Sequence, residues 1–358
     1  MKSIIPRTVP AGSHRHRRHP HHMSTVTLII LNRNGKHFLE PCLASIDRQT
    51  RPPEELILVD NGSDDGSQAW IRAHYPRATL LELGYNAGFS VAMNRAVDIA
   101  TGDYVTLLNN DTECEPQWLE VLTGALDQHQ DIGFCSSKLL YFNERELIDT
   151  AGDLFTTGGF AFKRGWGHMD QDQYKKPERI FGACAGASIY RRSMFEGIEG
   201  FDEDFFAYQE DTDLNFRAQL AGHPCLFVPE ARVYHHVGGT WKKTGYEFAV
   251  RLGQRNLIFV LVKNLPAGLW LRFGIPIILA HGCLFLMRVW GGYGIPVIKG
   301  LWDAVTGLRP MLKKRKRIQQ NRRVSNAYLA SIMTSNWIHL LFEPFYRKRA
   351  LKRQGIKV

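Results

Sequence analysis

The sequence predicts an α/β protein whose sheet is followed by an apolar and basic helical region. Over the first 110 residues, short β-branched or apolar runs alternate with segments of helical periodicity. This alternation is typical of β-α-β units in a parallel sheet. Asp and Asn residues directly follow several of the runs, and the C-terminal part is rich in Leu, Trp, Lys and Arg. With 44% hydrophobic residues, the chain of 358 residues can bury a sizeable core.

The first three predicted strands cover residues 25–31, 55–59 and 78–83, which are largely apolar or β-branched. Such runs are typical of strands that are buried on both faces of a sheet. Apolar residues at helical spacing over 38–46 join the first two strands, and Pro52 breaks that helix.

Polar side chains follow the first two strands. Asn32 stands after the first strand, and Asp60 and Asn61 stand after the second. Ligands of open α/β sheets bind at the carboxyl ends of the strands. Groups of this kind can bind a base and a ribose through hydrogen bonds, and a role in an ordinary turn is the alternative.

The fourth predicted strand, residues 104–108, follows a helix over 86–100 and stops at Asn109, Asn110 and Asp111. One carboxylate beside two amides at a strand end suits a divalent cation that also contacts substrate phosphates. An Asx turn that only ends the strand is equally compatible with these residues.

The motifs of several other α/β classes are missing. No GxGxxG follows the first strand and no GxxxxGK[ST] occurs, which disfavours nicotinamide, flavin and P-loop enzymes. The six cysteines have no CxxC spacing, so neither a zinc site nor a redox motif is indicated. The net charge of +10 lies at the two ends of the chain around an acidic middle, which does not favour nucleic acid as a partner.

The second half contains two further polar clusters. Residues 143–180 are rich in Gly and polar residues and predict loops and short strands over an active site, and residues 181–190 predict a strand of small residues. The clusters are Glu210 with Asp211 at a predicted helix start, and His235 with His236 at a strand end. Helix capping and structural roles are the alternatives.

Taken in order, these clusters resemble the motifs of glycosyltransferase family 2, the inverting transferases, and most of all its rhamnosyltransferase-like branch. The matching segments are 30–35, 59–63, 86–89, 108–112, 206–213 and 236–239, together with Asn94. Each motif is short, and their order and spacing make the resemblance specific. It covers about residues 24–330. It implies the GT-A fold of nucleotide-diphospho-sugar transferases, which is a Rossmann-like mixed sheet.

The resemblance also implies roles for single residues. Asp211 matches the family's catalytic base, and Glu210 stands beside it in the same motif. The residues implied in binding the donor nucleotide are Asn32, Asp60, Asn61, Asn86, Asn94, Asn109 and Asn110.

A metal site is implied at Asp111, which would hold Mg²⁺ or Mn²⁺ on the donor diphosphate. Asn109 stands where the family has the first Asp of its DxD motif, so Asp111 is the only carboxylate of the triplet. His236 with Gly239 resembles a motif that contacts the diphosphate or supports the metal, so His236 is the expected second metal residue, and His235 competes for that role.

The residue types suit an inverting sugar transfer. Such a reaction needs one base for the acceptor hydroxyl and, unlike a glycosidase, no second carboxylic acid, because a diphosphate leaves. The metal would neutralise the departing diphosphate. The implied partners are a nucleotide-diphosphate sugar, with dTDP-rhamnose named first and UDP-sugars on the same scaffold, and a glycan or polyprenyl-diphosphate-linked acceptor.

Residues 265–298 are unusually apolar and aromatic, but Arg272, Pro276 and Arg288 interrupt the run. A membrane-spanning helix needs about 20 apolar residues in a row. Helices that lie in the membrane interface are therefore favoured, with the basic run 313–317 attracted to anionic lipid. A helical packing module with a solvated basic face is the alternative.

We expect three parts: a disordered, basic and His-rich tail over 1–22, a transferase domain over 23–260, and a helical, membrane-associating region over 261–358. The expected location is cytoplasmic and peripheral, at the inner face of the cell membrane. Two other functions stay open. One is a nucleotidyltransferase on a similar sheet, for which residues 32–35 are a poor phosphate loop. The other is a non-catalytic protein that binds nucleotide sugars or glycans.

Overall fold

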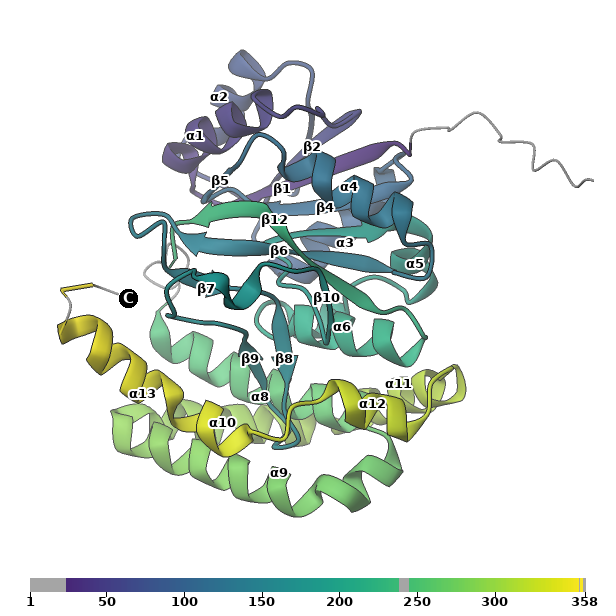
Figure 1. The fold of residues 1–358 in the computed structure, drawn as a ribbon, viewed down its shortest axis with the longest axis vertical. Helices are drawn as coiled ribbons and strands as arrows, with labels where there is room; N and C mark the ends of the chain where they lie inside the picture. The colour runs from purple at the N-terminus through teal and green to yellow at the C-terminus, as the bar shows by residue number, and fades with distance from the viewer. Residues whose placement is uncertain (1–23, 238–244, 354, 357–358) are drawn as a thin grey trace, which may run out of the picture.

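A mixed sheet with helices on both faces forms the upper part of the molecule in Figure 1, and the C-terminal helices lie below it. The computed structural model describes residues 24–237, 245–353 and 355–356. The predicted tail over 1–22 lies outside the described residues.

The first half of the sheet is parallel, as the sequence predicts. β1 (Val26–Asn32) lies between β2 (Glu55–Asp60) and β4 (Tyr104–Asn109), and β3 (Thr79–Glu82) pairs with the far side of β2. The carboxyl ends of these strands therefore meet at one edge of the sheet.

The second half of the sheet is mixed. β11 (Ala187–Arg191) runs antiparallel to both β4 and β6 (Phe134–Tyr141), whereas β12 (Cys225–His235) runs parallel to β6. The shorter strands are β5 (Thr112–Cys114), β7 (Ile148–Thr150), β10 (Glu178–Ile180) and the separate hairpin of β8 (Asp153–Phe155) and β9 (Ala161–Lys163). This topology confirms the predicted mixed sheet.

The strand predicted over 181–190 is shorter than expected. Gly182 exchanges backbone hydrogen bonds with Asp153, and the N–H of Ala183 donates to the side chain of Asn215. The first part of the segment thus has its backbone partners outside the main sheet, and only residues 187–191 join it.

Two helical layers enclose the sheet because side chains alternate along its strands. Val26, Leu28 and Ile30 of β1 pack in the cluster of α1 (Lys36–Asp47), α2 (Ser67–His74) and α4 (Trp118–Gln128). Ile29 packs in the cluster of α3 (Gly88–Ile99), α5 (Arg192–Gly197) and α6 (Glu210–Leu220).

The C-terminal helices form a third packed cluster against α6. Phe216 of α6 contributes to it together with Phe259 and Leu269. The helices are α8 (Tyr246–Asn264), α9 (Ala267–Arg288), the π-helical η3 (Val289–Tyr293), α10 (Gly294–Thr306), α11 (Leu308–Gln320), α12 (Asn326–Ile332) and α13 (Trp337–Arg353). The predicted domain boundary after residue 260 falls inside α8.

Candidate active site

The strand ends bring several of the predicted residues into one hydrogen-bonded line. The sheet register pairs Asn32 with Asp60 and Leu31 with Asn109. Asn110 Nδ2 donates to Asn32 Oδ1 over 2.6 Å, and Asn32 Nδ2 donates to Asp60 Oδ2 over 3.4 Å. This line is called the donor edge below, and it consists of Asn110, Asn32 and Asp60.

Asp60 is almost fully buried, and turn residues hold its carboxylate. The backbone N–H of Ser63 donates to Oδ1 over 3.0 Å, and Gln68 Nε2 donates to the same oxygen over 2.9 Å. Asp60 can therefore form the turn and also bind a ligand, which were the two predicted alternatives. Its Oδ1 organises the turn, while its Oδ2 faces Asn32.

Asn61 and Asn86 lie together at the start of α3. Asn61 Nδ2 donates to Asn86 Oδ1 over 3.2 Å, and Asn61 Oδ1 accepts the N–H of Ala87 over 2.8 Å. Asn94 lies farther along α3 and bonds both the N–H and the carbonyl of Phe201 over 2.9 Å. Asn94 is thus joined to the loop before the candidate base, and its role in donor binding stays a prediction.

Of the two histidines, His235 has the ring that faces Asp111. His235 Nε2 lies 3.4 Å from Asp111 Oδ1. His236 donates its backbone N–H to the carbonyl of Asp111 over 2.9 Å, and its ring stacks on Phe142 with centroids 3.6 Å apart. Gly239 of the predicted motif lies outside the described residues.

The charge on His235 depends on two acids. Burial lowers the pKa of His235, but hydrogen bonds to Asp111 and Asp149, together with their charges, outweigh burial and raise the pKa to about 9. Among the described residues no group of three or more His, Cys, Asp or Glu side chains is arranged to hold a metal ion. A metal ion must displace the proton on Nε2 of His235 to bind there. Asp111 and His235 then offer two ligands, which fits an ion whose other positions are filled by water and phosphate oxygens.

The candidate base Asp211 lies close to the donor edge through a short chain of contacts. Its carboxylate accepts backbone hydrogen bonds from Thr212, at 2.7 Å, and from Ala185. The next residue, Gly186, accepts the N–H of Asn109 through its carbonyl over 2.9 Å. Asp211 is therefore held beside the end of β4.

The environment raises the pKa of both acids in this motif. Burial raises the pKa of Asp211, and backbone hydrogen bonds and Lys163 oppose it. Burial, followed by the charge of Asp211, raises the pKa of Glu210 to about 8. Glu210 Oε2 has no hydrogen-bond partner among the described residues, which also favours its protonated form. The pair can thus hold one proton and one charge near neutral pH.

The segment predicted as loops and short strands over an active site contributes three ionisable residues that the sequence did not single out: Asp149, Asp153 and Lys163. Lys163 Nζ lies 2.7 Å from Asp149 Oδ1. Burial, followed by the charge of Asp211, raises the pKa of Asp153 well above its usual range. A usable signal was present, because both acids stand within a run of buried apolar residues, where an acid needs a partner.

Residues 199–209, called the base loop below, lead into α6 with unusual backbone angles. Glu199, Phe206, Tyr208 and Gln209 all have φ between 64° and 67°. Such angles cost free energy in residues other than Gly and persist only when surrounding contacts hold them. Asn256 of α8 supplies such contacts.

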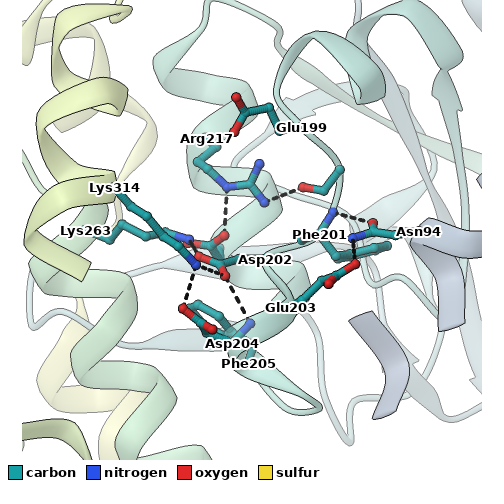
Figure 2. A network of polar contacts seen from close by, with 12 residues as sticks. Asn94, Glu199, Phe201, Asp202, Glu203, Asp204, Phe205, Arg217, Lys263 and Lys314 are labelled. Carbon is teal, nitrogen blue, oxygen red and sulfur yellow. Dashed lines mark hydrogen bonds and ion pairs between the residues drawn. The ribbon is translucent and has the colours of Figure 1, made fainter. Parts of the chain in front are cut away.

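Asn256 and Lys263, both on α8, hold the base loop. Asn256 Nδ2 lies within hydrogen-bond distance of three carbonyls, those of residues 205, 207 and 208, at 2.7–2.9 Å. Figure 2 shows Lys263 beside Asp202 of the base loop. The buried ammonium of Lys263 also lies 2.7 Å from Oδ1 of Asp213 in α6. Lys314 of α11 also pairs with Asp202. None of these contacts was predicted.

Comparisons with known proteins identify the family of this chain. The family model described as Glycosyl transferase family 2 matches residues 27–198. An N-acetylglucosaminyl-diphospho-decaprenol L-rhamnosyltransferase from Mycobacterium tuberculosis is 31% identical over an alignment of length 258 that covers 66% of this chain and 83% of the relative. A PGL/p-HBAD biosynthesis glycosyltransferase from Mycobacterium bovis is 29% identical over 67% of this chain and 90% of its own length.

Solved structures share the fold. GalNAc-T7, crystallised with UDP, GalNAc and Mn²⁺, matches with a TM-score of 0.55 and 16% identity over 68% of this chain and 48% of that chain. Staphylococcus aureus TarS matches with a TM-score of 0.52 and 15% identity over 83% of this chain and 88% of that chain. The predicted GT-A fold is confirmed, and the identity and coverage of the relatives show that this chain is a glycosyltransferase that belongs to glycosyl transferase family 2.

Proposed function

We propose that this chain is an inverting, metal-dependent transferase that moves a sugar from a nucleotide diphosphate to a lipid-linked glycan. The observation that carries the proposal is the contact chain from Asp211 through Ala185 and Gly186 to Asn109. It sets a carboxylate with a raised pKa beside the strand ends that would hold the donor. A protein that only binds nucleotide sugars needs no such group there.

Asp211 would act as the general base. It would take the proton of the acceptor hydroxyl while that oxygen attacks the anomeric carbon of the sugar, and the nucleoside diphosphate would leave with the bonding electrons. Attack on the face opposite the leaving group inverts the anomeric centre. The raised pKa of Asp211 makes its carboxylate a stronger base than an exposed one.

The donor edge would bind the nucleotide, with Asp60 Oδ2 as an acceptor for the base. Asp111 and His235 would hold Mg²⁺ or Mn²⁺ on the diphosphate, and the bound ion supplies charge neutralisation for the leaving group. The presence of UDP and Mn²⁺ in the GalNAc-T7 structure, which shares the fold, supports the use of a nucleotide donor and a divalent cation.

L-Rhamnose is the first candidate for the transferred sugar. A polyprenyl-diphosphate-linked glycan is the first candidate for the acceptor. The support is the mycobacterial relative, whose name specifies an L-rhamnosyltransferase acting on a diphospho-decaprenol acceptor. We further propose dTDP as the nucleotide that carries the rhamnose, with UDP-sugars as the alternative donors.

A lipid-linked acceptor requires access to a membrane, and α9 and α10 offer a suitable surface. Apolar side chains stand exposed along these helices and η3, with Leu271 90% and Trp290 93% exposed. The others include Ile275, Ile278, Ile295, Ile298 and Trp302. We call this set the apolar face; in Figure 1 α9 lies at the lower edge, on the side away from the sheet.

Peripheral docking through the apolar face fits these helices better than spanning. Among the described residues, only 267–306 is long and apolar enough to cross a membrane. Gly292, with φ of 86°, separates α9 from α10. Leu269, Ile277 and Ala280 of α9 are buried in the protein, so only one face of this helix is open to lipid.

Flotation with anionic vesicles tests the docking: Trp290→Ala should lower the bound fraction about tenfold at subsaturating lipid, as loss of one buried aromatic side chain implies. Exposed Tyr85, outside the apolar face, provides the control substitution. Equal binding of both variants would contradict the proposal.

The transferase proposal is tested with a panel of nucleotide sugars, with and without Mn²⁺, measuring both thermal shift and transfer to a short polyprenyl-diphosphate-linked N-acetylglucosamine. Asp211→Asn should abolish transfer and keep the donor-induced thermal shift. Asp111→Ala should lose the part of the shift that needs Mn²⁺. Undiminished transfer by Asp211→Asn would exclude Asp211 as the base, and an absence of transfer by the wild type with every donor would favour a binding protein.

A further inference from the structure

Asp149 is a fully buried carboxylate that the proposed reaction does not use directly. It lies in β7, which runs antiparallel to β6. The register pairs Thr150 with Leu139 and Ile148 with Leu140, so Asp149 is the extra residue of a β-bulge. Bulges next to active sites often re-aim a side chain.

The re-aimed carboxylate contacts a histidine and a lysine. Asp149 Oδ2 lies 2.9 Å from His235 Nδ1, and Asp149 Oδ1 lies 2.7 Å from Lys163 Nζ. The other ring nitrogen of His235, Nε2, lies 3.4 Å from Asp111 Oδ1. Asp149, the imidazole of His235 and Asp111 therefore form a continuous line from the sheet interior to the candidate metal position.

We propose that Asp149 is a positioning residue that fixes the ring of His235 and thereby sets the affinity of the site for a divalent cation. The proposal rests on the proposed function, in which Asp111 and His235 hold that cation. A histidine that binds a metal through one nitrogen usually donates the N–H of the other to a carboxylate or carbonyl, which fixes the ring and raises its basicity.

The surroundings of Asp149 agree with this role. The backbone of His235 is held between β5 and β6, where it pairs with Thr112 and Tyr141, but these pairings do not fix its ring. Asp149 is the residue that holds Nδ1. Its other oxygen, Oδ1, pairs with Lys163 Nζ over 2.7 Å, which holds the carboxylate in place.

A second buried carboxylate serves as a matched control. Asp170 has a side chain that is 10% exposed and pairs with buried Lys138 over 2.9 Å, as Asp149 pairs with Lys163. No contact between Asp170 and His235 or Asp111 is present among the described residues. Asp170→Asn therefore removes a buried charge of similar kind without touching the proposed metal ligands.

The experiment measures binding of Mn²⁺, alone and with UDP, by the loss of the free-ion signal in electron paramagnetic resonance. Asp149→Ala should raise the Kd for Mn²⁺ about 10–100-fold, which is the usual effect of losing such a partner. The isosteric Asp149→Asn, which keeps the side-chain shape if Asp149→Ala fails to fold, should raise it less. Circular dichroism checks that each variant is folded.

Three results would overturn the proposal. One is a Kd for both Asp149 variants within twofold of the wild type. Another is an equal loss of affinity in Asp170→Asn, which would indicate a general structural effect. The third is a wild-type protein that binds no Mn²⁺ with or without UDP, which also removes the metal from the proposed function. The first two leave the proposed function intact, so the two failures are distinguishable.

Discussion

The donor edge and the base loop are held in place by different kinds of contact. Asn32, Asp60 and Asn110 are set by the register of neighbouring strands and bond mainly to one another and to adjacent turns. The base loop has strained backbone angles and depends on partners from α8 and α11, about 50–110 residues later in the chain.

This difference suggests a division of labour. Substitutions at the donor edge should weaken donor binding but leave the fold stable, because hydrogen bonds between neighbouring strands hold these strands in place. Substitutions of the residues that hold the base loop should lower the free energy of unfolding and slow the chemical step. The C-terminal helices would then serve catalysis as well as membrane docking.

The largest expected effect is on stability, at Lys263. Lys263→Met leaves Asp202 and Asp213 buried without their shared cation. Removing the sole partner of a buried charge costs about 3–5 kcal/mol, which is the upper bound here because Asp202 keeps Lys314 and Asp213 keeps Arg217. Urea denaturation should show a loss of up to this size.

The control for Lys263 is Arg317 of α11, which pairs with Glu199 of the same base loop at the protein surface, each side chain being 57% exposed. Exposed pairs contribute about 0–1 kcal/mol, so Arg317→Met should cost little. A loss below about 1 kcal/mol for Lys263→Met would mean that the base loop does not depend on α8 in the way its contacts indicate.

The next effect is on turnover, at Asn256. Asn256→Asp turns an amide donor into an acceptor that faces three carbonyl oxygens, so the base loop must move. A misplacement of about 1 Å can cost on the order of 100-fold in rate. Steady-state kinetics should show a fall of this order in kcat with little change in the donor KM.

The opposite pattern is expected at Asn61, which holds the backbone of Ala87 at the start of α3. Asn61→Ala should raise the donor KM more than it lowers kcat. If both variants changed KM and kcat in the same proportion, the division between the two regions would fail.

The sequence is a good guide to the donor edge and a poor one to the base loop for a physical reason. The end of a strand is visible in a few consecutive residues: an apolar run that stops at Asn32 or Asp60 indicates both the strand and the polar residue at its end. A bond such as that of Lys263 with Asp202 joins residues that only the packed fold brings together. A lysine in a helix predicts a solvated side chain until its burial is known.

The two adjacent histidines also show that the sequence alone does not place a side chain in the site. Successive side chains of a strand alternate between its two faces, so either His235 or His236 suits the site until the register is known. In the structure His235 pairs with Thr112, the residue after Asp111, and its ring meets that carboxylate. The contact of Asp149 with His235 was beyond sequence reasoning because a bulge cannot be located from residue types alone.

A pH effect on stability is expected from Glu210. Its pKa is raised to about 8, so between about pH 4.5 and 8 the folded protein binds a proton that the unfolded chain has released. Stability contributed by this group therefore falls as pH rises through that window. Glu210→Gln should reduce the fall in melting temperature between pH 5 and pH 9. Identical pH dependence in the two proteins would mean that Glu210 is ionised in the folded state.

The smallest effect on stability, and the sharpest test of the donor edge, is expected at Gly35. A Cβ there would lie 2.1 Å from Asn110 Nδ2 and 2.8 Å from Asn32 Oδ1, so Gly35→Ala must push the Asn110 side chain away and break its bond to Asn32. Gly35 has φ of −117°, which Ala adopts without strain.

The change at Gly35 should therefore cost less than about 1 kcal/mol of stability, the value of one net hydrogen bond, and lower donor affinity by up to about tenfold. Gly197→Ala, which meets open space, controls for the added methyl group. An unchanged donor Kd in Gly35→Ala would show that the line from Asn110 to Asp60 does not form part of the nucleotide site, because the substitution removes its first bond and leaves the strands in place.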